Sequence, residues 1–297
     1  MSGDLREYST QVFAPSHIVQ ILQANGLALK KSFGQNLLIN RDAALRTLQY
    51  ADLHAGDRVL EIGPGLGALT FLLAGIVQEV VAIEIDRGFA AHLSRKTEEF
   101  ACGTVRIIHS DFLSLRLDDL PFSEPPNRVL SNFPYSIAIK SLIRIVDEFH
   151  SVDSITGMVQ RELADRISAS PGDKQYSFVS VYLQYHMEVR VVERRIGPQN
   201  FFPSPDVESS IVVLKRKRGQ SGPEGKLFKD VVKKAFSSRR KRLAKNLQSL
   251  PLKGSRSRVE RIVYELFNNP GIRAEELSVA DFTRLCTALR PSVKGYK

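Results

Sequence analysis

The stretch Val59-Leu60-Glu61-Ile62-Gly63-Pro64-Gly65-Leu66-Gly67 joins a short apolar run to a glycine-rich turn. The apolar run predicts a buried strand over Arg58–Ile62. The glycines allow a tight turn into a following helix, because they lack a Cβ. A strand, a tight turn and a helix in this order are typical of the first unit of a parallel α/β sheet. The stretch therefore predicts an α/β fold with a ligand site at the carboxyl end of this strand.

Strand and helix signals alternate from about residue 57 to residue 160, which predicts β-α-β units and a mostly parallel sheet. The expected strands are Arg58–Ile62, Val80–Glu84, Val105–His109, Asn127–Ser131 and Ser154–Val159. The expected helices between them are Gly67–Ala74, Phe89–Glu99 and Ile137–Phe149. Two further β-rich runs, Val189–Glu193 and Ser209–Lys215, predict an antiparallel pair at one edge of the sheet.

The pattern changes after Lys215, where Arg216–Gly225 has the Gly, Ser and Pro residues of a linker. From Lys226 on, apolar residues recur at helical spacing. The last helix is expected over Ser278–Leu289, with Ser278 as its N-cap. We therefore predict two domains: an α/β domain over residues 1–218, with N-terminal loops and helices, and a small, basic α-helical domain over residues 219–297.

The net charge of +10 is unevenly distributed along the chain. Between Lys215 and Arg258 there are sixteen Lys and Arg residues against two acidic residues, whereas the rest of the chain has 26 basic and 30 acidic residues. A basic segment on an otherwise slightly acidic protein is typical of proteins that contact nucleic-acid phosphates. A solvated helix face is the alternative explanation.

Composition excludes several other classes of protein. Hydrophobic residues make up 43% and charged residues 25% of the 297-residue chain, as in ordinary globular proteins. Cys102 and Cys286 are far apart and the six histidines are scattered, so we expect no metal site and a reducing compartment. With no signal-peptide pattern and no run of about 18 apolar residues, a soluble, intracellular protein without membrane contact is expected.

Three acidic residues bear on the ligand of the glycine turn. The turn alone suits either a dinucleotide or S-adenosylmethionine. Glu84 ends the second strand, where a carboxylate can accept both ribose hydroxyls, and Asp111 follows the third strand, where it can accept an adenine amine. Glu61 suits a positively charged ligand and is unfavourable beside a pyrophosphate. Together they favour S-adenosylmethionine, although Asp111 could instead cap a turn and Glu84 could be a solvated strand end.

The tetrapeptide Asn132-Phe133-Pro134-Tyr135 follows the fourth strand at the same edge of the sheet. The lone pair of an exocyclic adenine nitrogen is delocalised into the ring, and two acceptors on its N–H bonds can free it. The Asn132 side-chain oxygen and the Phe133 carbonyl are candidates for these acceptors. Pro134 stiffens the turn, and Tyr135 offers a ring on which a flipped base can stack. The motif predicts methylation of a nucleobase amine by positioning, without a general base; an ordinary turn is the alternative.

With these motifs established, the sequence resembles the ribosomal RNA adenine dimethyltransferase family from about Lys30 to Leu289. The resemblance rests on ordered segments along the chain. These are Lys31–Leu38, Gly63–Gly67, Ala82–Asp86, Asp111–Leu113, Asn132–Tyr135, Gln160–Arg166, Phe202–Ser209, Ala235–Lys241 and Arg273–Ser278. The resemblance implies a Rossmann-like class I methyltransferase fold with S-adenosylmethionine as the cofactor.

The resemblance also implies roles for particular residues. The methyl-donor site is expected to be lined by Asn36, Leu38, Gly63, Gly65, Glu84, Asp111 and Asn132. Asn132, Phe133, Pro134 and Tyr135 are expected to hold the target adenine. From their charge, the expected RNA contacts are Lys30, Lys31, Arg239, Arg240, Lys241 and Arg242. Phe133 stands where the family usually has Leu or Ile, so a narrower base pocket is expected, which would affect the second methylation.

The segments Phe202–Ser209 and Glu275–Phe282 resemble the small-subunit branch of the family. That branch implies dimethylation of two adjacent adenosines near the 3′ end of small-subunit (16S) rRNA, in the cytoplasm, with a role in ribosome biogenesis. No dimerisation stripe stands out in the sequence, so a monomer bound to the small ribosomal subunit is expected. A large-subunit rRNA methylase conferring drug resistance and a non-catalytic nucleic-acid-binding module remain alternatives.

Overall fold

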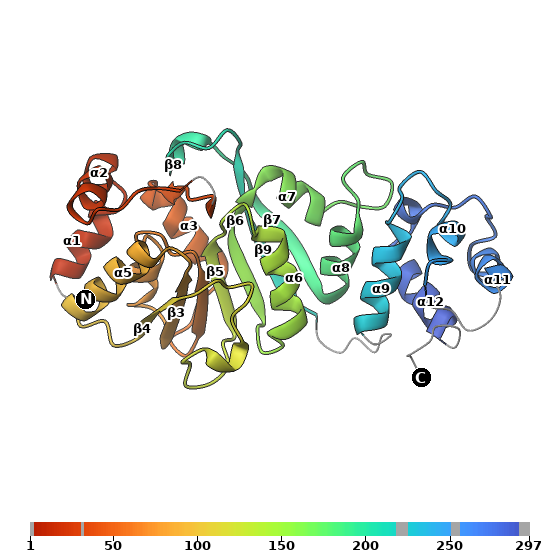
Figure 1. Cartoon of the computed structure of the whole chain (residues 1–297), viewed down its shortest axis with the longest axis horizontal. Helices are drawn as coiled ribbons and strands as arrows, with labels where there is room; N and C mark the ends of the chain where they lie inside the picture. The colour runs from red at the N-terminus through yellow and green to blue at the C-terminus, as the bar shows by residue number, and fades with distance from the viewer. Residues whose placement is uncertain (1–2, 31–32, 218–224, 251–255, 291–297) are drawn as a thin grey trace. The chain divides into compact units, whose positions relative to one another are not determined.

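The computed structural model describes residues 3–30, 33–217, 225–250 and 256–290, and it divides the chain into two compact units (Figure 1). The first unit comprises Met1–Ala164 and Val189–Arg216, and the second comprises Asp165–Glu188 and Lys217–Lys297. The expected domain boundary at residue 218 lies next to the division after Arg216. The structure also groups residues 165–188 with the second unit, because helix α8 (Phe178–His186) packs against the C-terminal helices α9 and α12.

The first unit contains a sheet of seven described strands in the order β4-β3-β2-β5-β6-β9-β7. The strands are β2 (Arg58–Ile62), β3 (Glu79–Glu84), β4 (Val105–His109), β5 (Arg128–Asn132), β6 (Ser154–Gln160), β7 (Met187–Ile196) and β9 (Ser209–Arg216). Strands β2 to β6 pair in parallel, whereas β9 pairs antiparallel with β6. The mostly parallel sheet with an antiparallel edge confirms the predicted fold class.

Helices and short strands of the first unit surround this sheet. They are α1 (Gly3–Gln11), α2 (Pro15–Ala24), β1 (Leu37–Leu38), α3 (Arg41–Ala51), α4 (Thr70–Leu73), α5 (Arg87–Glu99), the 3-10 turn Leu117–Asp119, α6 (Ala138–Glu148), the 3-10 turn Pro198–Asn200 and β8 (Phe201–Phe202). Strand β1 pairs antiparallel with β8. Helix α4 is shorter than the predicted Gly67–Ala74, because Gly67 has a φ of +84° and the chain is still turning there.

The order of the strands positions a crevice between β2 and β5. The chain proceeds from β2 through β3 to β4 on one side of the sheet, then returns to β5 and β6 on the other. Ligands of open α/β sheets bind at the carboxyl ends of the strands where the order reverses in this way. The Ser131 hydroxyl donates to the Ile62 carbonyl at 2.6 Å and ties the two strand ends together. The glycine turn after β2 therefore lies beside the motif that follows β5.

The described part of the second unit is helical. Its helices are α8, α9 (Gly225–Ala235), α10 (Leu243–Leu247), α11 (Arg256–Phe267), the 3-10 turn Ala274–Glu276 and α12 (Val279–Leu289); α7 (Arg161–Ile167) spans the division between the units. Ser278 caps α12 as predicted, since its hydroxyl accepts the Asp281 amide at 3.1 Å and the Asp281 carboxylate accepts the Ser278 amide. None of the helices in the described residues has the length and the apolar character needed to cross a membrane.

Candidate active site

The glycine turn after β2 has left-handed backbone at three positions. The φ angles are +70° at Gly63, +61° at Gly65 and +84° at Gly67. A Cβ on Gly63 would lie 2.6 Å from the Pro134 Cγ, and one on Gly65 would lie 2.7 Å from the Leu37 Cδ2. Glycine is therefore required here both by conformation and by space. These contacts hold the turn directly against the Asn132–Tyr135 motif and against strand β1.

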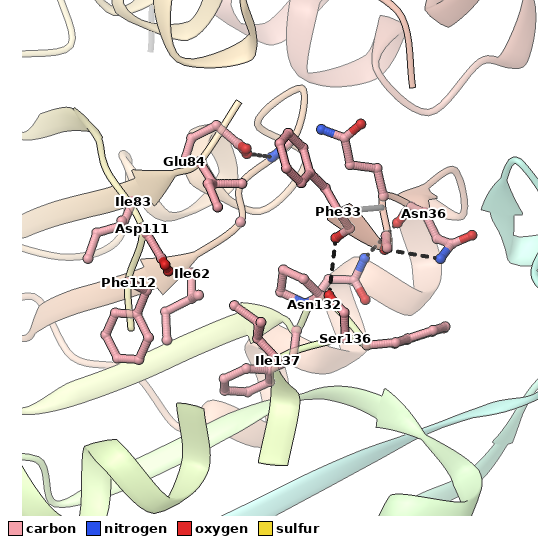
Figure 2. Close-up of a pocket in the computed structure, with 18 of the residues that line it drawn as sticks. Phe33, Asn36, Ile62, Ile83, Glu84, Asp111, Phe112, Asn132, Ser136 and Ile137 are labelled. Carbon is pink, nitrogen blue, oxygen red and sulfur yellow. Dashed lines mark hydrogen bonds between the residues drawn. The ribbon is translucent and has the colours of Figure 1, made fainter. Parts of the chain in front are cut away.

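A solvent-open cavity of about 820 Å³ lies at the carboxyl ends of β2 to β5 (Figure 2). Its lining brings together nine residues predicted for the donor and base sites. They are Asn36, Gly63, Gly65, Glu84, Asp111, Asn132, Phe133, Pro134 and Tyr135. The structure therefore gathers into one place residues that are spread over 100 positions of sequence.

Apolar residues that the sequence reasoning missed complete this cavity. They are Phe33, Leu37, Ile62, Ile83, Ile85, Phe112 and Ile137. Most of them directly precede or follow a predicted polar residue at a strand end, as Ile85 follows Glu84 and Phe112 follows Asp111. That adjacency is the signal that could have found them, because neighbours at a strand end share the same edge of the sheet.

A second cavity of about 370 Å³ adjoins the first and shares Asn36, Leu37, Gly63, Gly65 and Asn132 with it. Leu38 and Glu61 line only this smaller cavity. Leu38, which pairs with Phe201 in strand β1, therefore shares a cavity with Asn36, Gly63, Gly65 and Asn132 but not with Glu84 and Asp111. The two cavities form adjoining compartments on either side of the glycine turn and Asn132.

Glu84 is buried at the end of β3, which excludes the solvated strand end considered above. One carboxylate oxygen accepts the Gly65 amide at 3.2 Å, and the other accepts the Asp86 amide at 2.9 Å. Burial raises the pKa of Glu84, and these backbone donors oppose the rise. The carboxylate therefore ties the glycine turn to β3 while lining the larger cavity.

Asp111 caps a turn, which was the alternative considered for it, and it also lines the larger cavity. One carboxylate oxygen accepts the Leu113 amide at 2.9 Å, which caps the turn after β4. The residue also lines the larger cavity (Figure 2). A capped turn fixes the orientation of the carboxyl group, so the structural role supports a ligand-binding role.

The Asn132 side chain is held by a hydrogen bond from its nitrogen, whereas its oxygen accepts none from the described residues. Its Nδ2 donates to the Asn36 carbonyl at 3.0 Å (Figure 2). Its Oδ1 is buried and has no hydrogen-bond partner among the described residues. A buried acceptor without a partner is unfavourable, and such atoms in native structures call for an explanation. Because only the nitrogen can donate to a carbonyl, this contact fixes Oδ1 as an acceptor available to a ligand.

Phe133 and Tyr135 are fixed by their neighbours. Phe133 is 1% exposed, and a Cβ on Gly157 of β6 would lie 2.8 Å from its ring. Its ring thus occupies space that a glycine leaves open inside the sheet, while it also lines the cavity. The Tyr135 hydroxyl lies 2.5 Å from the Ser209 hydroxyl of β9, and burial raises the pKa of Tyr135. Ser209, at the end of the predicted Phe202–Ser209 motif, therefore orients the tyrosine.

Comparison with known proteins agrees with this geometry. A family model described as ribosomal RNA adenine dimethylase matches residues 26–289. The chain belongs to the ribosomal RNA adenine dimethylase family. It is 35% identical to a "Ribosomal RNA small subunit methyltransferase A" of Ligilactobacillus salivarius, over 97% of this chain and 98% of the relative. This dimethylase is therefore an rRNA methyltransferase, similar over nearly its whole length to a small-subunit enzyme.

Two solved structures resemble the dimethylase. A dimethyladenosine transferase from Plasmodium falciparum superimposes with a TM-score of 0.74 at 21% identity, over 86% of this chain and 97% of that one. The 23S rRNA methyltransferase ErmE superimposes with a TM-score of 0.63 at 25% identity, over 85% of this chain and 98% of that one. The first likeness confirms the fold.

Glu61 is the most deeply buried acidic group of the dimethylase site. It is 2% exposed and lines the smaller cavity, and the Thr70 hydroxyl donates to it at 2.7 Å. Burial raises the pKa of Glu61 from its ordinary value of 4.5 to about 8, the Thr70 bond opposes this rise, and the nearby Glu84 adds to it. A positively charged ligand in this cavity would favour the ionised carboxylate.

This pKa shift predicts how stability depends on pH. Between the two pKa values the folded protein keeps a proton that the unfolded chain has lost, so stability falls as pH rises. From about pH 6 to pH 8.5, Glu61 should lower the free energy of unfolding by about 2 kcal/mol. Urea unfolding of the wild type and Glu61→Gln at both pH values measures this. Equal pH dependence in both proteins would contradict the burial argument.

The predicted RNA contacts of the dimethylase differ in their surroundings. The Lys30 ammonium lies 2.8 Å from the Asp86 carboxylate, and Lys31 lies outside the described residues. Arg239 pairs with Glu275 at 2.7 Å within the second unit. The neighbouring residues of the same run are exposed, namely Arg240, Lys241 and Arg242. Lys30 and Arg239 therefore have a structural contact, whereas the exposed run offers charge to solvent.

Proposed function

We propose that this dimethylase transfers methyl groups from S-adenosylmethionine to N6 of two adjacent adenosines near the 3′ end of small-subunit rRNA. The observation that supports this most directly is the buried, unpartnered Oδ1 of Asn132 in a cavity that Glu84 and Asp111 also line. An acceptor of this kind suits an amine that must be held by its hydrogens. The near full-length similarity to a small-subunit enzyme supports the choice of substrate.

The side chains of the two cavities fit S-adenosylmethionine better than a dinucleotide. Glu84 and Asp111 supply acceptors for ribose hydroxyls and an adenine amine in the larger cavity. Glu61 supplies negative charge in the smaller one, where the amino-acid end and the sulfonium would lie. A pyrophosphate would instead meet three carboxyl groups, which is electrostatically unfavourable. When bound, S-adenosylmethionine supplies a methyl group that its sulfonium has activated.

The residues after β5 would then prepare the adenine amine. Asn132 Oδ1 and the Phe133 carbonyl would accept hydrogen bonds from its two N–H groups. These bonds would draw the nitrogen towards tetrahedral geometry, which frees its lone pair. Pro134 has no amide hydrogen to compete for these acceptors. Tyr135, oriented by Ser209, supports the base by stacking. Since Asn36 already holds the Asn132 side chain, the rate enhancement would come from positioning and electrostatics.

One assay tests this function directly. Small subunits that lack the modification are incubated with the protein and a tritiated methyl donor, and the RNA is digested to nucleosides. The expected product is dimethyladenosine, with a paired primer-extension stop near the 3′ end of the small-subunit rRNA. A stop in large-subunit rRNA would favour the drug-resistance methylase, and absence of transfer would favour a non-catalytic binding module.

The proposed function implies a binding partner, an oligomeric state and a cellular compartment for the protein. The partner is the small ribosomal subunit with its 16S rRNA, the protein acts as a monomer, and the cytoplasm is where these partners are found. Large complexes of this kind are contacted through their phosphates, for which the basic second unit is suited.

The exposed basic run carries a separate prediction. Reversing the charges of Arg240, Lys241 and Arg242 should weaken RNA binding and flatten the slope of log affinity against log salt by about two to three. Arg239 is left unchanged because it pairs with Glu275. The control exchanges Arg for Lys and Lys for Arg at the same three positions, which preserves the charge and should preserve the slope. An unchanged slope in the reversed variant would show that this run is not an RNA contact.

A further inference from the structure

Helix α1, red in Figure 1, lies outside the residues 26–289 that the family model matches, yet it reaches the donor site. One face of the helix is buried in the first unit, comprising Leu5, Tyr8 and Ser9, and Val12, in the turn directly after the helix, is buried too. Val12 is 1% exposed and lines the smaller cavity together with Leu38 and Glu61. One turn earlier, the Tyr8 hydroxyl lies 3.1 Å from the Leu66 carbonyl in the glycine turn.

The hydrogen bonds around Tyr8 have a fixed direction. Arg95 can only donate, so His92 Nδ1, at 3.3 Å from the guanidinium, must be the acceptor. His92 Nε2 then carries the hydrogen and donates to the Tyr8 oxygen at 2.8 Å. Tyr8 is left to donate its own hydrogen to the Leu66 carbonyl. Burial, with Arg95 and Lys96 nearby, lowers the pKa of His92 to about 4, so the ring stays neutral near pH 7.

The Tyr8 ring supports the same turn from its other end. It packs edge-on against Phe71, with ring centroids 5.3 Å apart. Phe71 in turn lies against Gly67, where a Cβ would be 2.5 Å from the phenylalanine ring. Tyr8 therefore acts on the turn at two places, through its hydroxyl at Leu66 and through Phe71 at Gly67.

We propose that α1, together with the turn that follows it, is part of the methyl-donor site. Val12 forms the wall of the compartment that receives the amino-acid end of the donor, and Tyr8 is a positioning residue that holds the glycine turn in its binding shape. The inference rests on the proposed function, because it takes S-adenosylmethionine as the ligand. The adenosine part of the donor lies in the larger cavity and does not meet α1.

The first test removes one hydroxyl. Tyr8→Phe keeps the ring and loses the bond to Leu66, and Tyr176→Phe is its matched control, because the Tyr176 hydroxyl donates to the Leu277 carbonyl at 2.8 Å in the second unit. Calorimetric titration with S-adenosylhomocysteine should show about a fivefold weaker Kd for Tyr8→Phe and no change for Tyr176→Phe. In turnover, KM for the donor should rise while kcat and KM for RNA stay constant. Equal donor affinity in both variants would overturn the positioning role.

The second test uses the shape of the ligand. Val12→Met extends a longer side chain into the smaller cavity, and the flexibility of methionine lets it adapt to the space there. It should weaken S-adenosylhomocysteine binding about fivefold and leave 5′-methylthioadenosine, which lacks the amino-acid part, within about twofold. Equal loss for both ligands would overturn the assignment of Val12. If the wild-type protein bound neither ligand, the proposed function itself would be wrong. The other outcomes bear only on Val12 and leave the proposed function standing.

Discussion

Replacing Asn132 with alanine should lower kcat for methyl transfer by about 10³-fold, while RNA affinity stays unchanged. The substitution removes the buried Oδ1 that no described residue uses, together with the Nδ2 contact to Asn36. Without this acceptor the adenine nitrogen keeps its lone pair in the ring, so the loss appears in the chemical step. Single-turnover transfer from tritiated donor to unmodified small subunits, with RNA binding measured in parallel, would show it.

The control for this variant is Ser136→Ala. Ser136 lines the same cavity, is exposed, and donates weakly to the Phe33 carbonyl at 3.4 Å. Its removal should change transfer by no more than about twofold, because a hydrogen bond at that distance contributes little. Transfer by Asn132→Ala at the wild-type rate would refute the role of this side chain in holding the amine.

Replacing Glu84 with glutamine should weaken binding of the methyl donor by roughly 100-fold, because the two charge-assisted hydrogen bonds proposed to ribose hydroxyls would be worth about 3 kcal/mol. The amide also turns an NH₂ group towards the Gly65 or Asp86 amide, both of which now donate to the carboxylate. The glycine turn loses an anchor at the same time. Titration with S-adenosylhomocysteine measures the affinity directly.

Strand β3 offers a matched control for Glu84. Glu79 is also buried, at the opposite end of the same strand, where its carboxylate accepts from Ser123 and Arg106. Glu79→Gln should therefore lower stability without changing donor affinity. If the two variants lost donor affinity equally, the effect at residue 84 would reflect a disturbed strand and not a ligand contact.

Local patterns predicted the strands of the parallel sheet correctly. Apolar runs predicted both bounds of β2 and β4 correctly, and the bounds of β3, β5 and β6 within one residue. They do so because a run of apolar residues indicates a strand whose side chains are buried. The N-cap at Ser278 was predicted in the same way. Glycine and acidic residues at strand ends identified the candidate site, since parallel strands present their carboxyl ends at one edge.

Other features depend on contacts between distant parts of the chain. The hydrogen bond from Asn132 to Asn36 joins segments 96 residues apart, and no local sequence pattern predicts it. The same holds for Ser209 beside Tyr135 and for Tyr8 beside Leu66. The grouping of residues 165–188 with the C-terminal helices also follows from tertiary packing. Such pairings become visible only when the order of the strands is known.

The contact between Gly63 and Pro134 constrains how this site can change in evolution. Each residue belongs to a different motif, and they meet so closely that not even a methyl group fits between them. A larger residue at position 63 would push the two loops apart and lengthen the path that the methyl group must cross. Neither motif can drift alone, so lineages that keep the chemistry should inherit the glycine and the proline together.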